Sequence, residues 1–148
     1  MEDIKYTDAD LLDHDAVAAV VKNVAGQILM QDHVKFGFWT IIIGKAKPGQ
    51  TPVEGIKEEI LEECGIVAKN CKEIAVKDYP YVRKGKMVNV KLHLFEVTEY
   101  SGKLENKEPH KHRRQEFVDL DSVKKMPFLS DATILYLETL GFKREAKI

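Results

Sequence analysis

The sequence contains few cysteines. Cys64 and Cys71 are the only two among its 148 residues, too few for the disulfide scaffold of a secreted protein. They also lack the paired spacing of a structural zinc site. We therefore expect two reduced thiols, with Cys64 in the core.

Long apolar runs and an excess of charge of one sign are also missing. No run reaches the length of a membrane span, and the first residues, MEDIKYTDADLLDHD, lack the basic-then-apolar order of a secretory signal. The chain has 23 Lys and Arg against 24 Asp and Glu, a formal charge of −1. This balance disfavours nucleic acid and anionic membranes as partners, because both attract a strongly positive field. We expect a cytoplasmic protein.

No low-complexity linker and no internal repeat divides the chain. A length of 148 residues is ordinary for one domain, and it can bury a sizeable core without disulfides or a structural metal. We therefore predict a single domain over residues 1–148. A homodimer is compatible with this composition.

A short helix is the clearest local element. Thr51 can cap its free amide donors, Pro52 suits the first helical position, and Glu54 completes a capping box. Gly65 tolerates the left-handed conformation that closes a helix. Residues at three- and four-residue steps form one apolar stripe, namely Val53, Ile56, Ile60 and Cys64.

Three carboxylates lie beside that stripe. The spacing of Glu59, Glu62 and Glu63 places them on one neighbouring helix face. Carboxylates held side by side repel one another unless a cation lies among them, and an all-oxygen cluster suits a hard divalent ion such as Mg²⁺. The alternative is a solvated acidic helix face.

Strand-like segments surround this helix. The run DAVAAVVK at 15–22, a turn, and QILMQ at 27–31 together predict a hairpin. Alternation in MVNVKLHLFEV at 87–97 predicts a strand with one face in the core and the other towards a cleft. A short strand is expected at 116–120 and a closing helix from about Asp131 to Leu140, with Leu140 facing inward. This order predicts an α/β fold with a mixed sheet between helices.

The stretch GKAKPGQTPVEGIKEEILEECGI, from Gly44 to Ile66, resembles the signature of the Nudix hydrolases. The positions in register are Gly44, Glu59, Ile60, Glu62, Glu63, Gly65 and Ile66. Two positions depart: Gln50 stands where the family has Glu, and Glu58 stands where it has Arg. The resemblance implies a Nudix-type mixed sheet sandwiched between helices.

The resemblance also implies a site. The metal ligands would be the backbone carbonyl of Ile43 or Gly44 with Glu59 and Glu63, while Glu62 would be a ligand or the base. Glu62 and Glu59 are thus the catalytic candidates, and which of them takes the proton stays open. The implied cofactor is Mg²⁺, with Mn²⁺ as a substitute.

The departure at Glu58 adds a negative charge beside the ligands, which should raise a carboxyl pKa or loosen the site unless something compensates. We expect the Gln50 amide to donate a hydrogen bond to Glu58. The alternative is that both changes are drift in a protein that no longer turns substrate over.

Downstream, NKEPHKHRRQEFVDL resembles a stretch of the members that hydrolyse nucleoside triphosphates. Those members have an acidic residue shortly after the Lys that is missing here, and Glu108 or Glu116 would substitute for it. The basic cluster at 110–114 is a solvated loop or a phosphate-binding site. We take Lys111, Arg113 and Phe38 as candidate substrate-binding residues.

These features predict metal-dependent hydrolysis of a pyrophosphate bond in a nucleoside di- or triphosphate derivative, with a small-molecule nucleotide as the partner. The alternative is a catalytically weak or inactive Nudix-like nucleotide-binding or interaction domain. The three carboxylates favour the enzyme; Gln50 and Glu58 favour the alternative.

Overall fold

Two sheets form the centre of the molecule in a computed structural model that describes residues 5–143. The larger sheet has the strand order β4 (Ile42–Lys45), β1 (His14–Val21), β6 (Lys86–Ser101), β5 (Val67–Arg83). The smaller sheet has the order β3 (Phe38–Thr40), β2 (Ile28–His33), β7 (His112–Val118). Strands β1 and β6 are parallel and the other pairs are antiparallel, so the larger sheet is mixed.

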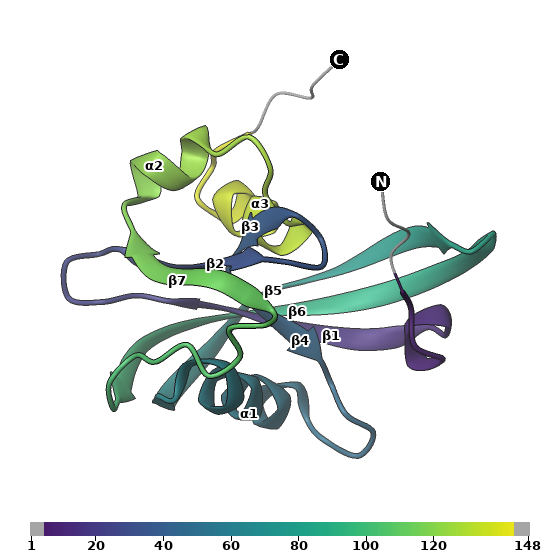
Figure 1. Ribbon diagram of the computed structural model, residues 1–148, viewed down its shortest axis with the longest axis horizontal. Coiled ribbons are helices and arrows are strands. Elements are labelled where there is room, and N and C mark those ends of the chain that lie inside the picture. Colours follow the sequence, from purple (N-terminus) through teal and green to yellow (C-terminus); the bar gives the residue numbers. More distant parts are fainter. Residues whose placement is uncertain (1–4, 144–148) are drawn as a thin grey trace.

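Helices cover the larger sheet on opposite sides (Figure 1). Helix α1 (Pro52–Cys64) packs on one face through a core that includes Val17, Ile56 and Ile60. Helix α3 (Asp131–Thr139) packs on the other face, with Leu94 and Tyr136 in its core. The described residues also form two short helices, η1 (Ala9–Leu11) and α2 (Leu120–Lys125). The predicted α/β fold with a mixed sheet between helices is confirmed.

Helix α1 begins and ends as its sequence predicts. The Thr51 side chain accepts a hydrogen bond from the backbone amide of Glu54, and the Glu54 carboxylate accepts one from the Thr51 amide. Gly65 closes the helix at φ +69°, in the left-handed region. The predicted stripe is buried at Ile56, Ile60 and Cys64, which anchors the acidic residues of the same helix against the sheet.

The predicted hairpin between 15–22 and 27–31 is wrong. Both edges of β1 are already occupied, by β4 and β6, and β2 pairs with β3 and β7 in the other sheet. An isolated bridge between Lys22 and Ile28 is what links the two segments. Local patterns could not show this, because the partners of β1 lie far along the chain.

Two further details differ from the predictions. Strand β7 begins at His112, so three of the five residues of the basic cluster at 110–114 lie in a strand that pairs with β2. At the end of α3, Leu140 is 47% exposed and not inward-facing. Within residues 5–143, none of the helices has both the length and the apolar character needed to cross a membrane.

The cap of α1 gives a test of this account. Thr51→Ala removes the side-chain acceptor for the Glu54 amide, and we expect the free energy of unfolding to fall by about 1 kcal/mol. Urea denaturation measures the change. Ser122→Ala, at an exposed position in α2, should lower the free energy of unfolding much less. Equal losses of this free energy in both variants would contradict the role assigned to Thr51.

Candidate active site

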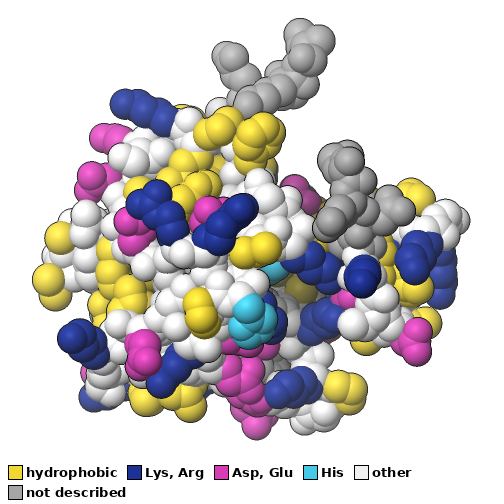
Figure 2. All heavy atoms as spheres, in the orientation of Figure 1, with side chains coloured by type: hydrophobic (Ala, Val, Ile, Leu, Met, Phe, Trp, Pro, Cys, Tyr) yellow, Lys and Arg dark blue, Asp and Glu magenta, His cyan; other side chains and the backbone are white. Residues whose placement is uncertain are grey.

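The three predicted carboxylates of α1 lie in different environments. Glu63 is buried, with 4% of its surface exposed, Glu59 is half-buried, and Glu62 is exposed. Acidic side chains gather over α1 on the face shown in Figure 2, with a histidine and several basic side chains nearby. The acidic stripe therefore runs from the interior to solvent and is not simply a solvated face.

Gly44 lies directly against this stripe. A Cβ atom at this position would lie 2.4 Å from Cδ and 2.5 Å from Cγ of Glu59. Strand β4 thus approaches α1 so closely that only glycine leaves room for the Glu59 carboxylate. This contact explains why a glycine precedes the acidic helix, and it places the β4 backbone beside the carboxylates.

Burial and mutual repulsion raise the pKa of both inner carboxyls. Desolvation, followed by the charge of Glu62, raises the pKa of Glu59 to about 7. Desolvation, followed by the charges of Glu59 and Glu108, raises the pKa of Glu63 to about 9. Lys111 opposes both shifts through its positive charge. Near neutral pH, Glu63 therefore holds a proton and Glu59 holds one in part of the molecules, unless a cation replaces these protons.

The surroundings of Glu63 fit such a cation. Its Oε2 atom is buried without a hydrogen-bond partner, and its Oε1 atom lies 3.7 Å from Nε2 of His112. Within residues 5–143, no three His, Cys, Asp or Glu side chains converge as a complete metal-binding group. A cation beside Glu59 and Glu63 would therefore complete its shell with backbone carbonyls and water, which hard divalent ions accept readily.

The departures from the family signature contact each other. The Gln50 amide donates a hydrogen bond to one Glu58 oxygen, as predicted, and the Lys47 ammonium pairs with the other. Lys47 also lies 3.6 Å from Oε1 of Glu62. The Lys47 ammonium and the Gln50 amide together lower the pKa of Glu58, in that order of effect. The extra negative charge is thus compensated within the loop.

The segment before β7 adds one more carboxylate. Glu108 contributes to the raised pKa values of Glu59 and Glu63, so it lies within electrostatic reach of both. Glu116 instead pairs with Arg114 on β7. Of the two predicted substitutes for the missing acidic residue, Glu108 is the one that the fold brings to the cluster.

The three candidate substrate-binding residues are placed differently. Lys111 pairs with Glu108 at 3.1 Å, beside the carboxylates. Phe38 packs 5.2 Å from Phe36 in a ring cluster that includes His33. Arg113 pairs with Asp32 at 3.5 Å, so it is engaged on the β2–β7 ladder.

His112 was predicted only as one member of the basic cluster at 110–114, a solvated loop or a phosphate-binding site, and Lys47 was not predicted as a site residue. His112 is 1% exposed, and its ring contacts that of His33 at a centroid distance of 5.2 Å. Burial lowers its pKa, which favours a neutral ring. The only sequence signal for Lys47 was its place in the glycine loop. Its contacts with Glu58 and Glu62 could not be predicted, because where a flexible side chain reaches depends on how that loop folds.

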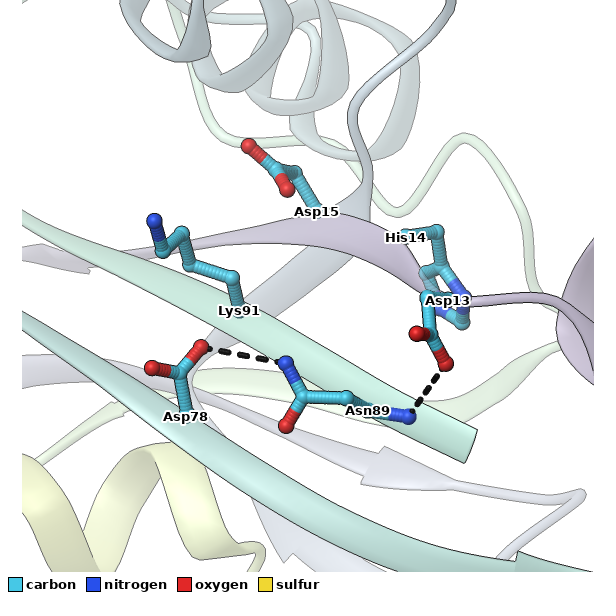
Figure 3. Close-up of a pocket in the computed structure, with 6 residues that line it drawn as sticks. All are labelled: Asp13, His14, Asp15, Asp78, Asn89 and Lys91. Carbon is cyan, nitrogen blue, oxygen red and sulfur yellow. Dashed lines mark hydrogen bonds between the residues drawn. The ribbon is translucent and has the colours of Figure 1, made fainter. Parts of the chain in front are cut away.

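A polar depression lies elsewhere on the larger sheet and is lined by Asp13, His14, Asp15, Asp78, Asn89 and Lys91 (Figure 3). Asn89 donates hydrogen bonds to Asp13 from its backbone and to Asp78 from its side chain. No residue of α1 lines this depression. We therefore keep the carboxylate cluster as the candidate active site.

Several solved structures share this fold. A MutT NUDIX hydrolase from Burkholderia pseudomallei has 23% sequence identity, with 86% of this chain and 98% of that chain covered and a TM-score of 0.73. A MutT protein from Bacillus halodurans has 24% identity, coverage of 88% and 84%, and a TM-score of 0.72. An Ap4A hydrolase from C. elegans has 20% identity, coverage of 86% and 91%, and a TM-score of 0.59. No curated protein matches the chain.

The acidic helix, the glycine approach and the two sheets define a protein of the Nudix pyrophosphohydrolase type. A family model described as the NUDIX domain matches residues 12–136. Because this match spans most of the chain, the chain belongs to the NUDIX domain family, which confirms the predicted family and the predicted class of enzyme.

The close approach of Gly44 can be tested directly. In Gly44→Ala, the added methyl group must displace the Glu59 carboxylate, so we expect Mn²⁺ affinity to fall at least tenfold, measured by titration calorimetry. Gly55→Ala is the matched control, because the nearest atom to its Cβ lies at an ordinary 3.5 Å. Equal Mn²⁺ affinity in the two variants would contradict the proposed geometry.

The raised pKa values predict how stability depends on pH. Between the unperturbed carboxyl pKa of 4.5 and the native value of about 9, native Glu63 holds a proton that the unfolded chain releases, so the metal-free protein should lose stability as pH rises through this range. Glu63→Gln removes this proton and should flatten the slope of melting temperature against pH. Parallel slopes in the wild type and the variant, both in EDTA, would show that Glu63 does not titrate in this range.

Proposed function

We propose that this chain is a Mg²⁺-dependent pyrophosphohydrolase, with Mn²⁺ as a substitute, and that it acts on a nucleoside di- or triphosphate derivative. The observation that carries this proposal is the pair of Glu59 and Glu63, held partly desolvated beside Gly44 with an unpartnered oxygen on Glu63. Repulsion of this kind destabilises the fold unless a cation or protons offset it.

A bound divalent ion would neutralise charge on the phosphate oxygens and lower the pKa of a bound water. The residues of the chain supply the rest. We assign the acceptance of the water's proton to Glu62 or Glu59, of which Glu62 is open to solvent. As the water oxygen bonds to phosphorus, the bridging P–O bond breaks, and its electron pair leaves with the departing phosphate. Lys111, beside Glu108, is placed to offset negative charge on the substrate.

A small nucleotide in the cytoplasm is the proposed substrate. Phe38 and the rings near it offer a surface on which a base can stack. This surface is close to the carboxylate cluster, because the His33 ring contacts both Phe38 and His112. The proteins of similar structure include MutT proteins, an Ap4A hydrolase, and a bifunctional NMN adenylyltransferase/ADP-ribose pyrophosphatase. We propose a substrate of this general kind and a single domain, with no membrane partner; a homodimer is compatible with this proposal.

One observation favours the alternative of a Nudix-like binding domain without turnover. Lys47 already places an ammonium group beside Glu58 and Glu62, so the chain itself supplies a cation at the outer end of the stripe. If Lys47 does not leave on metal binding, Glu62 cannot act freely as a base. Turnover assays separate the two functions.

The proposal predicts metal-dependent release of phosphate or pyrophosphate from a panel of nucleotides, with a slower rate on inorganic pyrophosphate. Glu63→Gln should reduce Mn²⁺ affinity and kcat/KM by at least the ten- to hundredfold that is typical when residues supporting a metal are lost. Glu138→Gln, on α3, is the control for a surface carboxylate.

Nucleotide binding without turnover under any metal would favour the binding domain. Turnover that persists unchanged in EDTA would exclude the proposed metal-dependent reaction.

A further inference from the structure

One wall of the carboxylate cluster is a polar strip of the smaller sheet that faces the end of α1. Two registered pairs across β2 and β7 form this strip, Gln31 with Gln115 and His33 with His112. The Nε2 atoms of the two glutamines lie 4.0 and 3.4 Å from Sγ of Cys64. Gln115 also donates a hydrogen bond to the backbone carbonyl of Glu63 at 3.2 Å. We call these four strand residues the polar wall.

The polar wall contains most of the unpartnered polar atoms in the described part of the chain. Within residues 5–143, seven buried side-chain nitrogen and oxygen atoms have no hydrogen-bond partner, and six of them belong to the wall or to Glu63. Both ring nitrogens of His112 and Oε2 of Glu63 are among the six. Buried polar atoms without partners are rare and destabilise a fold. Their concentration beside Glu63 links the wall to the site.

His112 is held with its ring next to the Glu63 carboxylate. Its backbone amide donates to the Glu108 carbonyl at 3.1 Å, and its own carbonyl accepts from Nδ2 of Asn106 at 2.7 Å. The ring is buried and lies edge-on to that of His33, at a centroid distance of 5.2 Å and an interplanar angle of 80°. Backbone and ring are thus both fixed, with Nε2 3.7 Å from Oε1 of Glu63.

This contact is one small movement away from a hydrogen bond. An ordinary N–H···O bond extends to about 3.2 Å, so the gap between Nε2 and Oε1 is about 0.5 Å. Hydrogen bonds between the groups of a site are often long before the ligand binds and shorten in the complex. His112 gives up no other hydrogen bond in closing the gap, because neither of its ring nitrogens has a partner.

A neutral donor suits a carboxylate that also binds a cation. Burial lowers the pKa of His112, and burial followed by the charge of His112 lowers that of His33 to about 4, so neutral rings are favoured at pH 7. A neutral imidazole donates one N–H bond without adding a positive charge that repels a divalent ion. Carboxylates that ligate metals are commonly held by such hydrogen bonds.

The two oxygens of Glu63 differ in their surroundings. Oε1 faces His112, whereas Oε2 is buried without a partner. Lys47 and Gln50 satisfy Glu58 at the outer end of the acidic stripe. Within residues 5–143, His112 is the one basic side chain within 4.0 Å of a Glu63 oxygen. The inner carboxylate is therefore oriented from the polar wall and not from the loop before α1.

We infer that His112 is a positioning residue for Glu63: its Nε2–H donates to Oε1 and thereby leaves Oε2 directed at the divalent ion. The ion comes from the proposed function, on which this inference rests. A protonated Glu63 keeps a carbonyl oxygen that accepts the same hydrogen bond, so the contact can also be measured in the metal-free protein.

The first test measures Mn²⁺ affinity by titration calorimetry. His112→Leu removes the donor and should weaken Mn²⁺ binding about tenfold or more, the loss typical when a group that orients a metal ligand is removed. His112→Gln keeps an N–H donor and should recover most of the affinity. Thr133→Val is the control for the loss of a buried polar group, because its hydroxyl bonds to the Ile41 amide beside α3, and it should leave the affinity unchanged.

The second test is a double-mutant cycle on melting temperature in EDTA. Glu63→Met removes both carboxylate oxygens and keeps an unbranched side chain. His112→Leu should lower the melting temperature of the wild type but not that of the Glu63→Met variant, because the effects of residues in contact are coupled.

Unchanged Mn²⁺ affinity in His112→Leu, or a loss that His112→Gln shares in full, would overturn the inference. Equal losses of melting temperature in both backgrounds would overturn it as well.

Turnover assays of the same proteins with Mg²⁺ separate this inference from the proposed function. Coupling in EDTA without metal binding or turnover would leave the contact of His112 with Glu63 standing and reject the proposed reaction. Metal-dependent turnover with additive losses of melting temperature would do the reverse.

Discussion

Electrostatic repulsion between desolvated carboxylates is the constraint around which this site is built. Helix α1 buries its apolar stripe in the core and thereby carries Glu59 and Glu63 out of water. Their pKa values rise because desolvation, together with the repulsion between nearby carboxylates, outweighs the opposing positive charge of Lys111. A protein keeps such an arrangement at a cost in stability, and a divalent cation or a pair of protons is what offsets that cost. Gly44 of β4 has no side chain, which leaves room for the Glu59 carboxylate and for the proton or cation that neutralises it.

The loop before α1 shows how a changed signature can keep its charge balance. An Arg in place of Glu58 would bring one positive charge, and in this chain Lys47 brings it from eleven residues earlier. Gln50 then donates to Glu58 where a Glu would repel it. The substitution at 50 and the substitution at 58 are therefore consistent as a pair, and neither on its own indicates a loss of activity. The position of Lys47 near Glu62 makes this ammonium group the part of the site most affected by metal binding.

Helix α1 could be predicted from sequence because its signals are local: a cap, a proline, a capping box and a closing glycine all lie within fifteen residues. The hairpin expected from 15–22 and 27–31 failed because strand pairing is decided by distant segments, and β1 takes β6 as its parallel partner. The same limit applies to the site. Glu59 and Glu63 follow from helical spacing, whereas His112 reaches Glu63 only through the pairing of β7 with β2.

The most direct test of the central claim is a crystal structure of the protein soaked in Mn²⁺, with anomalous diffraction used to locate the ion. We predict an anomalous peak between Glu59, Glu63 and the backbone of β4 at Gly44, with Lys47 displaced from Glu62. A peak elsewhere, or none at this position with Lys47 still against Glu62, would contradict it.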